Sequence, residues 1–176
     1  MKRTAHRFAA AAFAASLVVG CAASANTRDH EKKDSEEAYA MEDEQGLRAK
    51  TRASNKDFDT TLSDLKAAIE TRGLKVFAVV DHAAGAASVG AELRPSTLII
   101  FGNPNVGSPI MQAAPQMGIV LPLKAHVYED AEGAVFVAVT DIEAEIAALG
   151  GDTGDLPTRA ARVAGALGAI AGEAAE

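Results

Sequence analysis

The chain has 176 residues, with 17 Lys or Arg against 24 Asp or Glu, and its formal net charge at pH 7 is −7. This acidic balance argues against a nucleic-acid partner and against binding to anionic lipid through surface charge alone. The chain contains one cysteine and no tryptophan. An intrachain disulfide is therefore excluded, and the fold must depend on an aliphatic core.

The first 20 residues have the pattern of an export signal. A short basic stretch is followed by an uncharged apolar run over 8–19, which suits a signal peptide and falls short of the ~20 residues of a membrane-spanning helix. The run ends in a sequence that resembles the lipobox of bacterial lipoproteins: Leu17-Val18-Val19-Gly20-Cys21. The resemblance implies cleavage before Cys21, a diacylglyceryl thioether on its sulfur and a further acyl chain such as palmitate on its amine.

An ordinary signal peptide is the alternative, because Ala23-Ser24-Ala25 has the A-x-A form of a cleavage site. Only the lipoprotein reading uses the single cysteine. Ala22 follows that cysteine, and in Gram-negative sorting this resemblance favours the outer membrane, with the protein facing the periplasm. A mature chain beginning at Cys21 would lose three basic residues and carry −10.

The following segment, 21–46, is polar and mixes both signs of charge without apolar periodicity. Such a composition predicts a flexible tether between the lipid anchor and a domain. We therefore divide the chain into a signal (1–20), a tether (21–46) and one domain (47–176).

The domain begins with a predicted strand over 47–53. A helix follows, because four apolar residues recur on one face: Phe58, Leu62, Leu65 and Ile69. Ser54 with Asp57 resembles a capping box at its start, and Gly73 ends it.

Further elements alternate along the chain. We predict a strand over 74–80, a helical turn rich in small residues over 83–92, a central strand over 96–101 and a short helix over 109–114. An asparagine–proline loop, 102–108, separates the last two.

The end of the domain predicts a hairpin and two helices. Apolar and polar residues alternate over 121–129, a turn follows at 130–133, and 134–139 returns antiparallel. Asp141 is expected to cap a helix to 149, and Asp155 to begin the last one. This order predicts an α+β fold with a mainly antiparallel sheet.

Several short segments together resemble the ordered motifs of the DUF302 family, over about residues 50 to 150. They are Val79-Val80-Asp81-His82, Leu93-Arg94-Pro95, Ile100-Phe101-Gly102-Asn103-Pro104, Gly107-Ser108-Pro109-Ile110-Met111 and Leu121-Pro122-Leu123-Lys124. The resemblance implies a TBP-like topology with helices on one face of the sheet, a tendency to form homodimers and no known function. Ser108, Val120 and Val139-Thr140 depart from residues that the family often has.

The candidate ligand-binding residues come from these segments: Asp81, His82, Phe101, Asn103, Ser108 and Lys124. His82 is also the candidate general acid or base, since imidazole titrates near neutral pH. The alternative makes Asp81 a helix cap and His82 a hydrogen-bonded anchor. The loop 102–108 either offers free N–H groups to an anion or is a tight strand-to-helix connection.

Spacing supports no metal site and no cofactor. His82, His126, Met111 and Met117 include ligand types that copper accepts, yet they follow no recognisable pattern. Ser108 lacks the G-x-S-x-G surroundings of a hydrolase nucleophile. Three functions remain open: a non-catalytic module for a small ligand or a protein, an enzyme using His82, and a structural homodimer of the envelope.

Overall fold

A computed structural model of the chain describes residues 47–176, so the predicted signal, Cys21 and the tether lie outside the described residues. Five strands form one sheet in the order β1-β5-β4-β3-β2, and every neighbouring pair is antiparallel. The strands are β1 (Ala49–Ala53), β2 (Lys75–Asp81), β3 (Ser96–Gly102), β4 (Leu123–Glu129) and β5 (Val135–Thr140). The predicted α+β class with an antiparallel sheet is confirmed.

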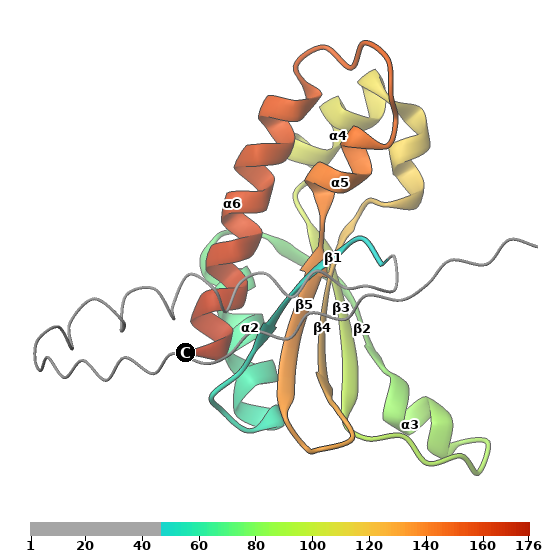
Figure 1. Cartoon of the computed structure of the whole chain (residues 1–176), viewed down its shortest axis with the longest axis vertical. Coiled ribbons are helices and arrows are strands. Elements are labelled where there is room, and N and C mark those ends of the chain that lie inside the picture. Colours follow the sequence, from blue (N-terminus) through green and yellow to red (C-terminus); the bar gives the residue numbers. More distant parts are fainter. Residues whose placement is uncertain (1–46) are drawn as a thin grey trace, which may run out of the picture.

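The helices leave one face of this sheet open (Figure 1). They are α2 (Phe58–Thr71), α3 (His82–Ala87), α4 (Pro104–Ala113), the 3₁₀ helix η1 (Pro115–Ile119), α5 (Ile142–Ala147) and α6 (Leu156–Ala175). The long helices α2 and α6 pack against each other and against the same face of the strands. Helices α4 and α5 gather at one end of the sheet, and α3 projects from the other end.

The alternation expected along β4 places its residues as predicted. Leu123, Ala125 and Val127 face the helices and are buried, while the residues between them are half-buried on the open face. Leu65 and Ile69 of α2 meet this layer and are fully buried. Burial of each such side chain contributes roughly 1.5–3 kcal/mol, so this layer holds α2 on the sheet.

Helix α2 has a different cap from the predicted one. Asp57 is its N-cap and accepts a hydrogen bond from the amide of Thr60 at 2.9 Å. The Ser54 hydroxyl lies within 2.7 Å of the Thr61 hydroxyl and accepts from the amide of Lys56. Asp57 takes the cap because its carboxylate sits directly before the first helical residue. Gly73 follows the helix with φ +66°, as a C-terminal glycine should.

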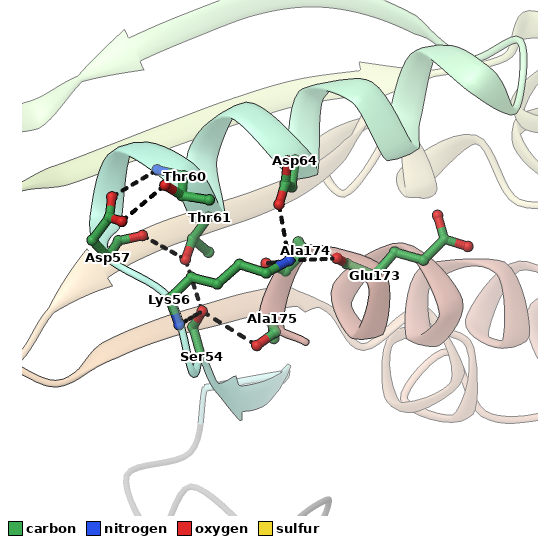
Figure 2. A network of polar contacts seen from close by, with 9 residues as sticks. All are labelled: Ser54, Lys56, Asp57, Thr60, Thr61, Asp64, Glu173, Ala174 and Ala175. Carbon is green, nitrogen blue, oxygen red and sulfur yellow. Dashed lines mark hydrogen bonds and ion pairs between the residues drawn. The ribbon is translucent and has the colours of Figure 1, made fainter.

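A polar network joins the start of α2 to the end of α6 (Figure 2). The Lys56 ammonium donates to Asp64 Oδ2 at 2.9 Å and to the carbonyl oxygens of Glu173 and Ala174 at 3.2 and 3.4 Å. The amide of Asn55 donates to the Ala175 carbonyl at 2.9 Å. The last carbonyls of a helix have no partner within the helix, and Lys56 and Asn55 supply partners here.

Strand β2 is an edge strand of the described sheet and is largely exposed. Its pairing with β3 shifts between Val76 and Ala78, which places a bulge at Phe77. Bulges redirect a side chain and occur often beside functional sites. The ring of Phe77 is 45% exposed and lies at the end of the sheet that carries α4.

Helix α4 begins five residues earlier than predicted. Asn103 is its N-cap, Pro104 occupies the first turn, and Pro109 lies inside it. Proline suits a first helical turn because it has no amide hydrogen to lose there. The predicted loop 102–108 is therefore the end of a strand and the first half of a helix.

Candidate functional site

A cavity of about 580 Å³ lies at the end of the sheet where α4 and α5 gather. Its walls come from the start of β2, the end of β3, helix α4, the segment 121–123 before β4, the start of α5 and residues 159–170 of α6. Ligand sites in proteins typically have about 300–1,000 Å³ and mainly apolar walls. The size and position therefore make this cavity the candidate functional site.

The lining is mostly aliphatic and aromatic. Representative apolar members are Leu74, Phe77, Ile110, Met111, Leu121 and Leu167. Polar side chains enter from α4 and its cap (Asn103, Asn105, Ser108) and from α6 (Arg159 and Arg162). Among the described residues that line it, none is His, Cys, Asp or Glu. This surface can hold an apolar ligand by burial and orient it at a few polar groups.

Two of the predicted site residues, Asn103 and Ser108, line the cavity. The backbone amides beside them are already engaged. The amide of Asn105 donates to Asn103 Oδ1, and those of Val106 and Gly107 donate to the Asn103 carbonyl, all at 2.9 Å. The free N–H groups considered for an anion are thus used to begin α4.

Asp81 and His82 lie at the opposite end of the sheet. In the β2–β3 pairing, Lys75 is opposite Gly102, beside the cavity, whereas Asp81 is opposite Thr97. Six residues of strand separate these positions by roughly 20 Å. Asp81 caps α3 by accepting from the amide of Ala84 at 2.8 Å, which is the alternative role considered for it.

His82 is exposed and contacts His126 edge to face, with ring centroids 5.7 Å apart. His126 stacks on Tyr128, and Tyr128 stacks on Phe136. We call these four residues the aromatic row of the open face. His126 Nε2 also lies 2.8 Å from the hydroxyl of Ser96. Partial burial, and secondarily the charge of His82, lower the pKa of His126 below its ordinary 6.5.

Phe101 and Lys124 occupy two other places. Phe101 is fully buried in the core, since its strand faces the helices there. The Lys124 ammonium donates to the carbonyl oxygens of Val120 and Pro122 at 2.6 and 3.1 Å. Partial burial lowers its pKa, against the opposing charge of Glu145. Lys124 therefore contacts the cavity wall from behind and does not line the cavity.

The six predicted site residues are thus not brought together. Asp81 ends β2 and Asn103 follows β3, and the antiparallel pairing of β2 with β3 puts those two strand ends at opposite ends of the sheet. Phe77, Arg159 and Arg162 were missed. The signal for the two arginines is their spacing of three on a helix whose next apolar residue, Val163, faces inward. No local signal marked the bulge at Phe77.

The comparison with known families decides the affiliation. The domain of unknown function DUF302 matches residues 50–174. The chain belongs to the DUF302 family. The matched range extends beyond the segments that resemble the family motifs. It includes all residues that line the cavity and almost all of α6. The DUF302 description carries no activity.

A solved DUF302 structure has the same fold. It is described as an uncharacterized conserved protein DUF302 from Bacillus stearothermophilus, and it aligns with a TM-score of 0.65 over 73% of this chain and 98% of that one. Sequence identity is 17%, so the likeness is one of fold.

Relatives of known name are longer proteins. Two are called fluoride-specific ion channel FluC 1, from Brucella suis and Brucella abortus, and one FluC 2, from Brucella melitensis. Each is 42% identical over 81 residues, which cover 46% of this chain and 30–32% of the relative. This DUF302 chain thus spans about a third of those relatives' length.

Two features are absent from residues 47–176. None of the helices there combines the length and apolar character needed to cross a bilayer. That part of the chain also holds no group of three or more His, Cys, Asp or Glu with the geometry to bind a metal ion.

Proposed function

We propose that this chain is a membrane-tethered domain of the cell envelope that binds a small apolar ligand without transforming it. The cavity beside α4 carries the proposal. It has the volume of a ligand site and is walled by apolar side chains from five separate segments. The anchor at Cys21 and the tether 21–46 complete the proposed architecture, with the domain facing the periplasm and the outer membrane as the favoured address.

The chemistry of the cavity supports binding over catalysis. General acid–base work needs a titratable group within hydrogen-bond reach of the reacting atom. The described lining has arginine, asparagine and serine as its polar side chains, and arginine stays protonated at physiological pH. His82, the candidate acid or base, lies at the other end of the sheet.

Displacement of a neutral fluorescent probe tests the binding function. N-phenyl-1-naphthylamine is apolar and brightens when it is buried. The full chain is used with Cys21→Ser, so that an acyl group of its own cannot compete. We expect saturable binding. Ala166→Phe should weaken it at least about tenfold, because Ala166 is exposed and lines the cavity.

Ala169→Phe is the matched control. Ala169 is also exposed on α6, and it is not part of the lining. Binding should be unchanged in this variant. The proposal fails if the probe does not bind, or if both substitutions have the same effect.

Acylation at Cys21 has its own test. We expect a metabolically supplied alkyne analogue of palmitate to label the chain in bacterial cells and to leave Cys21→Ala unlabelled. Equal labelling of both chains, or none of either, would favour the ordinary signal peptide.

A homodimer is the second candidate, and the open face of the sheet favours it. The aromatic row crosses this face, and Val80 beside it is exposed. Light scattering after gel filtration should give a dimer at micromolar concentration. Tyr128→Glu should shift it to monomer, whereas Ile119→Glu, at a residue 86% exposed elsewhere, should not. A wild-type monomer would overturn this candidate.

A further inference from the structure

The charged groups of the cavity are all positive. Arg159 and Arg162 are the lining residues with a formal charge, and both belong to α6. Residues three apart on a helix share one face, so the two guanidinium groups lie beside the same stretch of wall. This cationic pair stands out in a chain whose net charge is −7.

The two arginines differ in how they are engaged. Arg159 Nε and Nη2 contact the same oxygen, Oδ2 of Asp155, at 2.8 and 2.7 Å. Asp155 precedes α6 and is not part of the lining. Within residues 47–176, no carboxylate lies within ion-pair distance of Arg162. Arg162 thus offers guanidinium donors at the cavity, next to a neighbour that Asp155 holds in place.

The backbone amides at the start of α4 are not available to an anion. The amides of residues 105, 106 and 107, at the start of α4, all donate hydrogen bonds to Asn103. The apolar lining residues include Phe77, Met111 and Leu121, which come from other segments than the arginines. The guanidinium groups are therefore the positively charged donors that an acidic group would meet here. An apolar chain or ring attached to that group would lie against the apolar walls.

We propose that the ligand of this cavity is an anionic amphiphile, with an apolar body among the walls and one acidic head at Arg162. The inference rests on the proposed binding function and adds the chemical class of the ligand. Guanidinium suits a carboxylate or phosphate head because its N–H groups form a planar fork. Arg162 selects the head, and the apolar walls supply most of the contact area.

Competition against the bound probe tests this class. Decanoate, decanol and decylamine share one chain length and differ in charge. We expect decanoate to displace N-phenyl-1-naphthylamine at a concentration at least about fivefold lower than decanol, as a charge-assisted hydrogen bond to the exposed Arg162 should give. Decylamine should be the weakest competitor, since it brings a like charge to the arginines.

Arg162→Gln should remove the preference for decanoate over decanol and leave the displacement of the probe by decanol unchanged. Arg48→Gln is the matched control, because it deletes the same charge at an exposed ion pair with Glu145, outside the cavity. A preference that survives Arg162→Gln, or equal competition by acid and alcohol, overturns the inference while probe binding still upholds the cavity as a site. Loss of probe binding in the wild type overturns both.

Vesicles distinguish two sources of the acidic head. Phosphatidylglycerol vesicles should displace the probe more than phosphatidylcholine vesicles, in an Arg162-dependent way, if the ligand is a membrane lipid. Displacement by decanoate in solution without that vesicle preference assigns a soluble acid. Either result supports an anionic amphiphile, and the absence of both overturns it.

Discussion

Lys124 Nζ donates a hydrogen bond to the carbonyl oxygen of Val120 at 2.6 Å. A second bond reaches the Pro122 carbonyl at 3.1 Å, so one ammonium group holds both ends of the segment 120–122. Leu121 and Pro122, within this segment, are cavity wall. Lys124 therefore links the open face of the sheet to the shape of the candidate site.

Lys124→Met keeps most of the length of the side chain and removes both hydrogen bonds. We expect unfolding free energy to fall by about 1–2 kcal/mol, measured by urea denaturation, and probe affinity to fall with it because the wall loosens. Lys66→Met is the control, since Lys66 has no ion pair or hydrogen-bonded side chain within residues 47–176. Unchanged probe affinity in Lys124→Met would show that the segment holds its place without the ammonium.

Lys56→Met should destabilise the last turn of α6. Its ammonium serves two terminal carbonyls of that helix and the Asp64 carboxylate, and a cation there also favours the helix dipole. We expect the free energy of unfolding to fall by about 1–2 kcal/mol. Amide hydrogen exchange should quicken in the last turn of α6 and remain the same in β4. Uniform quickening across the domain would instead indicate global destabilisation.

Alanine substitutions at Phe101 and Phe77 should affect different properties of the domain. Phe101 is fully buried, so Phe101→Ala should cost about 3–5 kcal/mol of stability. Phe77 is 45% exposed and lines the cavity, so Phe77→Ala should cost about 1 kcal/mol or less and weaken probe binding. Thermal unfolding and probe titration on the same samples check both. A large stability loss in Phe77→Ala would place its ring in the core.

His126 predicts a pH dependence of stability. Burial, and then His82, lower its pKa in the folded chain below the ordinary 6.5. The unfolded chain therefore binds the proton first as pH falls. The contribution of His126 to the free energy of unfolding is fully present above pH 6.5. It is lost as the pH falls below that value, towards the pKa of His126 in the folded chain.

Lowering the pH from about 7.5 to about 5.5 should lower the urea midpoint of the wild type. The decrease should be smaller in His126→Gln. His82→Gln should keep most of the drop, because burial is the larger cause. A drop that persists in full in His126→Gln would assign it to other titrating groups.

Local patterns predicted much of the fold. The alternation over 121–129 gave β4 and its two faces, and the apolar spacing from Phe58 to Ile69 gave α2 and its buried side. These succeeded because the repeat of each element is written into neighbouring residues. The predicted start of α4 is wrong, because Asn103 and Pro104, predicted to lie in a loop, are a helix cap and first turn.

The sequence by itself determined the family, the α+β class and the strand and helix order, because each depends on short-range periodicity or on ordered motifs. Only the tertiary structure decided which residues meet. The antiparallel pairing of β2 with β3 puts Asp81 and His82 at one end and Asn103 at the other. Arg162 lines the same cavity as Phe77 and Leu121 only because α6 packs back over the sheet, and such pairing of distant segments leaves no local pattern.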